Sequence, residues 1–369
     1  MNSMEKFFKM LSLTPYSDRT EIPVFPMMVT TYGAIGGVTQ KETIESVDKW
    51  IEAMERTFAI VGRPDVVMPM CPGDTIFIMG LPARIPGREL DDNALYQFVE
   101  TPFFDDPSEY QKIMQMGWQA WQGMYMCRIQ NPPFTSPEQL MGRYGQLGAN
   151  LGRTLGYIYG NGLVPIFESA TAPIFDTLSM ARSMAEFLFD LVDDPGPIMD
   201  IINTYQAAAD EQTIGMLKAN NGTRCGCFAM RSSASFLSPD MFEEYAWPGL
   251  KGMIERFHAA GILVVVHADG NWTPMLEYFT QLPKGSMHLE LDGETDMEKA
   301  CEILGGWQSV RGDVPASLLW TGTPEDVTAY CDKLISMWMP KGGFMLGSGC
   351  EVPLNVKPEN VKAMIDAVR

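Results

Sequence analysis

Polar residues that could bind a metal follow an apolar run in the segment GILVVVHADGN, residues 261–271. The run ends on His267 and Asp269, although the whole chain contains only 3 histidines. A cysteine, Cys350, follows a second apolar run, GFMLGSG. A histidine, a carboxylate and a thiolate could supply three ligands to zinc and leave a fourth position open, as in catalytic zinc sites. Spacing alone favours a simpler interpretation, in which His267 is hydrogen-bonded, Asp269 forms a turn before Gly270 and the thiol is incidental.

Two further carboxylates could act as proton donors or as metal ligands. Glu168 closes the apolar run LVPIFES, and burial there would raise its pKa towards the range of a general acid. An equal alternative is a carboxylate that accepts hydrogen bonds from the backbone amides of a turn. Glu290 lies in the run MHLELD. Together with Glu168 and Asp269, it is a candidate for the catalytic acid or the third metal ligand.

Three more polar residues are candidates for contacting a substrate. Asp74 follows an apolar run in the segment PGDTIFIMG, and Asp292 precedes Gly293, where an Asp-Gly pair is first of all a turn signal. Arg231 ends the run CFAMR. It could pair with a substrate carboxylate, although pairing with one of the neighbouring acids is the simpler expectation.

These residues follow or lie in apolar runs that we predict to be buried strands. The eight runs are residues 24–29, 65–70, 163–169, 227–231, 262–267, 287–292, 309–314 and 343–349. Helical patterns separate them, with start signals such as Ser238-Pro239 and Thr323-Pro324. This alternation is typical of parallel strands with crossover helices, and eight units predict a closed (β/α)8 TIM barrel. An open doubly wound sheet is the alternative, but no glycine-rich nucleotide motif follows a strand.

One connection is much longer than the others. Roughly ninety residues separate the second and third predicted strands, far beyond the usual loop length. We therefore expect a helical insertion over about 76–160, rich in aromatic residues, that forms a lid or a partner surface over the barrel mouth. No linker or repeat indicates a second domain, so residues 1–369 are expected to form a single barrel domain with this insertion.

Composition excludes several classes of function. The formal net charge of −19 repels nucleic acid and anionic membranes, so we expect neither as a partner. No run approaches the roughly 18 apolar residues of a membrane helix, and the N-terminal segment does not read as a secretory signal. The 7 cysteines, an odd number, indicate reduced thiols and a cytoplasmic protein.

The C-terminal third of the chain resembles a known family. The segments GDVPASLLWTGTPEDVTAY and MPKGGFMLGSGCEVPLNVKPENV are similar to the closing half of the uroporphyrinogen decarboxylase superfamily. The similarity extends back through TAPIFDTLSMARS and FLSPDMFEEYAWPGL, so it covers most of residues 160–369. The resemblance implies a (β/α)8 barrel.

Two chemistries occur in that superfamily. Its decarboxylases bind an acidic tetrapyrrole through N-terminal arginines, which the segment IPVFPMMVTTYGAIGG lacks, although Asp74 could match their aspartate. Its corrinoid-dependent methyltransferases include thiol-methylating members with zinc on HxC and a distant cysteine. Here HAD and SGC stand in those places, so His267 and Cys350 match two ligands and Asp269 replaces a cysteine.

The resemblance therefore implies an O-demethylase component that moves a methyl group from a small donor, expected to be an aromatic methyl ether, to the Co(I) corrinoid of a partner protein. Zinc, or protonated Glu168, would stabilise the phenolate leaving group. Two alternative activities are methyl transfer from a methylcobamide to a thiol and a uroporphyrinogen decarboxylase-type decarboxylation. A hypothesis of a different class is that the barrel is not an enzyme and only binds or stores metal. We also expect a homodimer.

Overall fold

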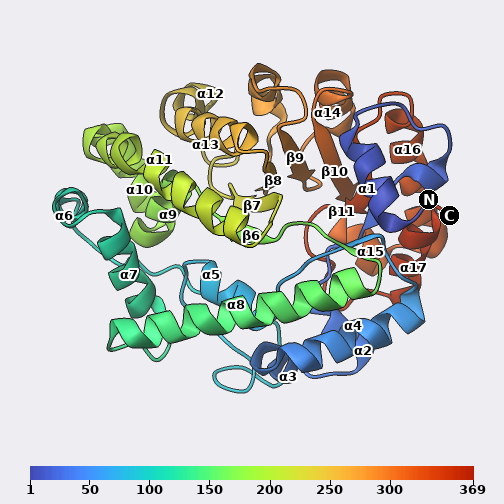
Figure 1. The fold of residues 1–369 in the computed structure, drawn as a ribbon, viewed down its shortest axis with the longest axis horizontal. Helices are drawn as coiled ribbons and strands as arrows, with labels where there is room; N and C mark the ends of the chain where they lie inside the picture. Colours follow the sequence, from blue (N-terminus) through green and yellow to red (C-terminus); the bar gives the residue numbers. More distant parts are fainter.

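Eight strand positions close a parallel barrel in the computed structural model, which describes residues 1–369 (Figure 1). Seven strands form one sheet in the order β1-β11-β10-β9-β8-β7-β6, and β2 pairs with β5. A bend at residues 166–168 separates β5 from β6, which together make the third strand position. The Asp65 amide donates to the Val24 carbonyl at 3.1 Å and joins β2 to β1. The predicted TIM-barrel fold is confirmed.

The barrel strands are β1 (Val24–Phe25), β2 (Val66–Val67), β5 (Val164–Pro165), β6 (Ser169–Thr171), β7 (Arg224–Phe228), β8 (Leu263–Ala268), β9 (Met287–Leu291), β10 (Ser309–Val314) and β11 (Phe344–Ser348). Each of the eight predicted runs overlaps one of these positions. The runs are nearly continuous in apolar residues because strands of a parallel barrel are covered on both faces.

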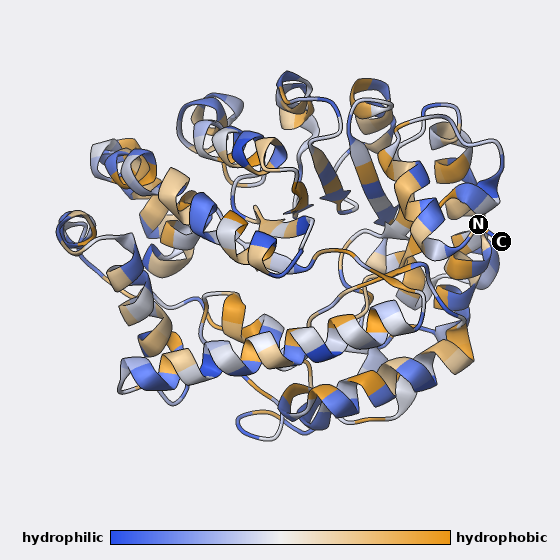
Figure 2. Cartoon of the chain, in the orientation of Figure 1, coloured by the Kyte–Doolittle hydropathy of each residue, from blue (hydrophilic) through white to orange (hydrophobic).

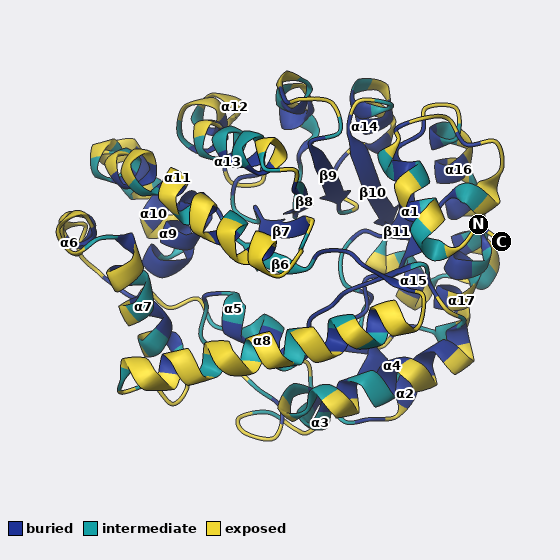
Figure 3. Ribbon diagram, viewed as in Figure 1, coloured by how far each residue is buried: buried dark blue, intermediate teal, exposed yellow.

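The barrel is surrounded by helices whose outer faces are exposed (Figures 1 and 3). The main ones are α4 (Val47–Val61), α8 (Pro137–Gly160), α9 (Ile174–Arg182), α10 (Met184–Asp193), α11 (Gly196–Ala219), α13 (Trp247–Ala259), α14 (Met297–Leu304), α16 (Pro324–Trp338) and α17 (Pro358–Asp366). Hydrophilic and hydrophobic residues lie side by side along them (Figure 2), as expected for helices with one buried face. Thr323 caps α16 with a hydrogen bond to Asp326, which confirms that predicted start.

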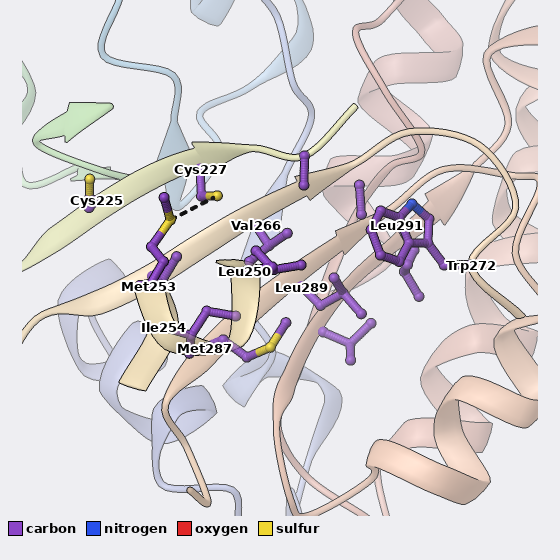
Figure 4. Close-up of a cluster of buried hydrophobic side chains, with 14 of the residues drawn as sticks. Cys225, Cys227, Leu250, Met253, Ile254, Val266, Trp272, Met287, Leu289 and Leu291 are labelled. Carbon is purple, nitrogen blue, oxygen red and sulfur yellow. Dashed lines mark hydrogen bonds between the residues drawn. The ribbon is translucent and has the colours of Figure 1, made fainter. Parts of the chain in front are cut away.

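Two hydrophobic cores hold these layers together. The larger one contains 80 buried residues and lies mainly between the strands and the helices. Val266 and Leu289 on the strands and Met253 of α13 all belong to this core, and the Cys227 thiol is 3.6 Å from the Met253 sulfur (Figure 4). Cys227 is fully buried, and all seven cysteines of the chain are free thiols.

The smaller core fills the barrel itself. Its 14 buried residues include Met345 and Val265 on the strands and Phe7 and Met10 of α1 (Ser3–Leu11). Helix α1 covers the N-terminal ends of the strands, because Lys6 pairs at 3.2 Å with Asp65, which immediately precedes β2. The barrel is therefore closed by α1 at the N-terminal ends of its strands.

Residues 76–160 contain several elements outside the barrel strands. A short antiparallel pair, β3 (Ala83–Arg84) and β4 (Gln97–Phe98), is followed by α6 (Ser108–Met116), α7 (Trp118–Ile129) and the long helix α8. Shorter helices elsewhere include α2 (Thr31–Gly36), α3 (Gln40–Glu45), α5 (Pro72–Ile78), α12 (Pro239–Met241) and α15 (Ala316–Thr321). No helix is both long and apolar enough to cross a membrane.

Candidate metal centre

His267 lies inside the mouth of the barrel. It is in register with Phe228 on β7 and Glu290 on β9, and its side chain is 9% exposed. Residues alternate between the two faces of a strand. Because Val265 belongs to the barrel interior, His267, two positions later, also faces inward.

Asp269 and Cys350 converge on the same side of the His267 ring. His267 Nε2 lies 3.3 Å from Asp269 Oδ1 and 3.8 Å from Cys350 Sγ, and one ligand atom from each residue falls within 4.8 Å of the others. The structure thus brings together the three residues that the sequence suggested as metal ligands, although they come from two strands on different sides of the barrel.

The spacing of these atoms suits a tetrahedral zinc ion. Zinc bonds of about 2.0–2.1 Å to nitrogen or oxygen and about 2.3 Å to sulfur place tetrahedral ligands roughly 3.4 Å (N to O) and 3.6 Å (N to S) apart. The observed separations of 3.3 and 3.8 Å are close to both values. One imidazole, one carboxylate and one thiol form a donor set of the catalytic zinc type, with a fourth position free for a ligand.

Glu290 orients the His267 ring towards this point. Its Oε2 lies 2.9 Å from His267 Nδ1, which leaves Nε2 directed at Asp269 and Cys350. Carboxylates that hold the second nitrogen of a metal-binding histidine fix its tautomer and its orientation. Glu290 is 3.4 Å from the Arg311 Nε. Burial alone would raise the pKa of Glu290, but Arg311 and then His267 outweigh it and lower that pKa to about 2.

The electrostatics of His267 follow from the same groups. Burial alone would lower its pKa, but the Asp269 carboxylate, Cys350 and Glu290 outweigh it and raise the pKa well above 6.5. Without a metal, the ring therefore carries a second proton. A metal at Nε2 would take the place of that proton, so metal binding is coupled to proton release.

The loop after β8 holds Asp269 in place. Gly270 has φ +83°, and a Cβ at this position would lie 2.6 Å from Ser235 Oγ, so the turn requires glycine. The Gly270 amide donates to Asp292 Oδ2 at 2.6 Å, and Trp272 Nε1 donates to the Asp269 carbonyl at 3.0 Å. Asp269 therefore sits on a fixed turn, and Asp292 supports that turn.

Asp269 also lines a cavity of about 560 Å³, which is large enough for a small aromatic molecule. Half of its twelve lining residues are hydrophobic: Met79, Leu81, Phe98, Met180, Met230 and Phe236. The others are Arg231, Ser235, Asp269, Gly270, Asp292 and Glu294. Of the three candidate metal ligands, only Asp269 lines this cavity.

Two predicted site residues do not join this group. Glu168 lies in the bend before β6, and its amide bonds to the carbonyl of Arg224 at the start of β7. Its carboxylate pairs with Arg224 Nη2 at 2.6 Å and accepts from Tyr159 Oη at 2.5 Å. Arg224 is in register with Leu263, four positions before His267 on β8, so Glu168 lies towards the closed end of the barrel.

Asp74 lies beside a separate cavity. It is 2% exposed, pairs with Arg143 Nη2 at 2.9 Å and accepts from Asn150 Nδ2 at 3.1 Å. That cavity, of about 370 Å³, shares only Leu81 with the lining of the larger one. Arg231, by contrast, lines the larger cavity and pairs with Glu100 at 3.0 Å, so its contact with a substrate stays a prediction.

Arg311 was missed by the sequence analysis. It is fully buried, approaches Glu290, and donates from Nη2 to the Gly349 carbonyl at 3.2 Å, next to Cys350. Gly347 leaves room for it, since a Cβ there would lie 2.8 Å from the Arg311 side chain. The available signal was an arginine inside the buried run SVRGDV.

The insertion also contributes to the mouth. Phe98 of β4 lines the cavity, and Tyr96 packs edge-on against Phe98 at 5.4 Å. Burial, and then the charges of Glu351 and Cys350, raise the pKa of Tyr96.

Comparisons with known proteins match the chain to one family. The family model described as uroporphyrinogen decarboxylase (URO-D) matches residues 154–369. Two curated relatives, both described as methylcobamide:CoM methyltransferase MtbA, come from Methanosarcina acetivorans and Methanosarcina mazei. They are 23% and 25% identical to this chain over 138 residues, which span 37% of the chain and only 39% of each relative.

The fold has a similar solved structure. A methyltransferase from Methanosarcina mazei matches with a TM-score of 0.71 at 14% sequence identity, covering 100% of this chain and 98% of that chain. This likeness concerns the fold, and it agrees with the closed barrel described above.

Proposed function

The chain belongs to the uroporphyrinogen decarboxylase family, and we propose that it is a methyltransferase that uses a metal centre at His267, Asp269 and Cys350. The proposed reaction moves a methyl group from a small aromatic methyl ether to the Co(I) corrinoid of a separate partner protein. The observation that carries the proposal is the convergence of three ligand atoms beside an apolar cavity.

The chemistry of an ether explains why such a centre is needed. Co(I) attacks the methyl carbon, the carbon–oxygen bond breaks, and its electron pair remains on oxygen as a phenolate. The conjugate acid of that leaving group has a pKa of about 10, as for tyrosine. A zinc ion held by the three residues would supply a Lewis acid near the oxygen. Losing one interaction of this kind typically costs about a hundredfold in rate.

The side chains of the protein have distinct tasks in this proposal. Glu290 keeps His267 Nε2 free and directed at Asp269, and Arg311 holds Glu290. Phe98 and the methionines of the cavity surround an aromatic ring and reduce its contact with water. A proton from solvent then converts the released phenolate into a phenol.

Methyl transfer to a thiol is a second candidate, because the two curated relatives are described as methylcobamide:CoM methyltransferases. Here Asp269 supplies an oxygen ligand, a harder donor than a thiolate, which favours coordination of an oxygen-containing substrate. Decarboxylation of a substrate with many carboxylates is disfavoured, because Arg231 is the only basic residue among those lining the cavity.

The proposal is tested with the purified chain and Co(I) corrinoid under anaerobic conditions. A set of methoxyaromatic compounds should convert the Co(I) spectrum to that of methyl-Co(III), and His267→Ala should abolish the conversion and lower the zinc content. A second assay mixes the protein with methyl-Co(III) corrinoid and thiols, and it measures the alternative reaction, methyl transfer to a thiol. If thiols are methylated and no ether is cleaved, the donor assignment is wrong, and if neither reaction occurs, the proposed activity is wrong.

A further inference from the structure

The cavity beside the metal-binding residues has an uneven charge distribution. Three of its twelve lining residues, Asp269, Asp292 and Glu294, are acidic, and only Arg231 is basic. The Arg231 Nη1 is already engaged, at 3.0 Å from Glu100 Oε1 and 3.2 Å from the Ser179 carbonyl. Its charge is therefore balanced by a residue outside the lining.

The other two acidic lining residues, Asp292 and Glu294, have no cationic partner. Asp292 accepts hydrogen bonds only from the amides of Gly270 and Glu294, and neither Asp292 nor Glu294 takes part in an ion pair. A bound zinc dication would not change this, because Asp269 and the Cys350 thiolate would balance it. Two negative charges thus remain at the cavity wall, in a chain whose net charge is −19.

We propose that this cavity selects uncharged methoxyphenols and discriminates against ring-bearing carboxylates. A phenolic hydroxyl can donate to Asp292 or Glu294, which both retain acceptor capacity, whereas a substrate carboxylate would face like charges there. The methionines and phenylalanines that line the cavity would contact the aromatic ring of the substrate. The assignment of these molecules as methyl donors rests on the proposed function, but the charge preference is a property of the cavity.

A binding measurement tests the charge preference of the cavity separately from the assignment of these molecules as methyl donors. Titration calorimetry with 4-methoxyphenol, 4-methoxybenzamide and 4-methoxybenzoate compares two neutral rings with an anionic ring of nearly the same shape. The zinc-loaded protein should bind the neutral compounds at least about tenfold more tightly, and the difference should shrink as salt is raised, because ions screen the repulsion. Equal or tighter binding of the benzoate, or no binding of any ring, would overturn the inference.

A pair of variants tests the source of the preference. Glu294→Lys places a positive charge at the cavity wall and should reduce the neutral-to-anionic ratio about tenfold or more. Glu302→Lys makes the same change in net charge at an exposed position of α14 outside the cavity and should leave the ratio unchanged. Equal ratios in the two variants would contradict the assignment to Glu294.

A variant at Glu100, the residue that balances the charge of Arg231, provides an independent check of the charge preference. Glu100→Gln removes the negative charge that lies 3.0 Å from Arg231, so the positive charge of the guanidinium is no longer balanced and should improve benzoate binding. Methyl transfer to Co(I) corrinoid is measured in parallel with the same compounds. If binding shows the expected preference but no compound is demethylated, the proposed function fails and the selectivity of the cavity stands.

Discussion

A single side chain, Asp269, distinguishes this candidate centre from the two-cysteine pattern that the sequence resembles. It lies 3.3 Å from His267 Nε2 and offers oxygen where that pattern has sulfur. Soft thiolate ligands make a zinc site more suitable for thiol chemistry, and a carboxylate makes it harder. Asp269 is thus the residue at which the choice between ether and thiol substrates is best tested.

We expect Asp269→Cys to shift the reaction towards thiols. The variant should retain zinc, because a thiolate replaces a carboxylate, and ether cleavage should fall about tenfold or more relative to methyl transfer to a thiol. Zinc analysis and the two corrinoid assays measure both effects. Asp269→Ala is the control and should lose metal as well as both activities. A ratio unchanged by cysteine would show that this ligand does not set the substrate.

A pH prediction concerns Asp313, which lies on β10 and accepts from Tyr330 Oη at 2.8 Å. Burial raises the pKa of this carboxyl from 3.8 to about 7. The folded protein therefore keeps the proton that the unfolded chain has lost, so stability from this group is fully present below pH 4 and is lost as pH rises to about 7.

The isosteric variant Asp313→Asn lacks this titration. Relative to the wild type it should gain stability between pH 4 and 8, by an amount on the order of 4 kcal/mol if the whole shift is realised. Urea denaturation at several pH values measures the difference. A difference that is flat across this range would mean that Asp313 has an ordinary pKa in the folded protein.

Among the structural elements, the turn after β8 has the most direct effect on the site. Gly270→Ala should cost about 1–2 kcal/mol of stability, because alanine is strained at φ +83° and its Cβ would meet Ser235. The displaced turn should also weaken zinc binding. Gly261→Ala is a matched control, since φ there is +76° but no atom lies within 4 Å of a Cβ. Equal zinc affinities in the two variants would show that the Ser235 contact does not position Asp269.

At the third strand position the structure differs from the sequence-based prediction. The run LVPIFES predicts one unbroken strand over residues 163–169, which Glu168 closes. In the structure the strand bends and resumes at Ser169, which pairs with Cys225 near the start of β7. The offset between neighbouring strands depends on how the barrel closes, which a local run of residues does not encode.

For the molecule as a whole, the barrel could be predicted because apolar runs are local features. At His267, Asp269 and Cys350 the spacing alone favours a turn and an incidental thiol, and only the resemblance to a known family points to these residues as a group. Arg311 could not be predicted, since its role depends on Glu290 and Gly349 meeting in three dimensions. The closed lower end of the barrel was missed for the same reason. Nothing in the N-terminal segment MNSMEKFFKML predicted that its Phe7 would be fully buried in the barrel core.

Helix α1 should therefore matter to global stability. Phe7→Ala removes a ring from the barrel core and should cost about 3–5 kcal/mol. Phe8→Ala changes the next residue, which is 59% exposed, and should cost less than about 0.5 kcal/mol. Thermal or urea denaturation compares the two variants. Similar losses for both would mean that α1 does not seal the barrel.

The candidate metal site contains one thiol rather than two, which affects how the protein responds to oxygen. A zinc site built on two cysteines can close into a disulfide once the metal leaves, and it then needs a reductant before it can bind metal again. Cys350 has His267 and Asp269 as neighbours, and all seven cysteines of the chain are free. The three residues therefore cannot form a disulfide among themselves. Mild oxidation of the metal-free form should stop at a sulfenic acid on Cys350, which an excess of a simple thiol reduces so that zinc can bind.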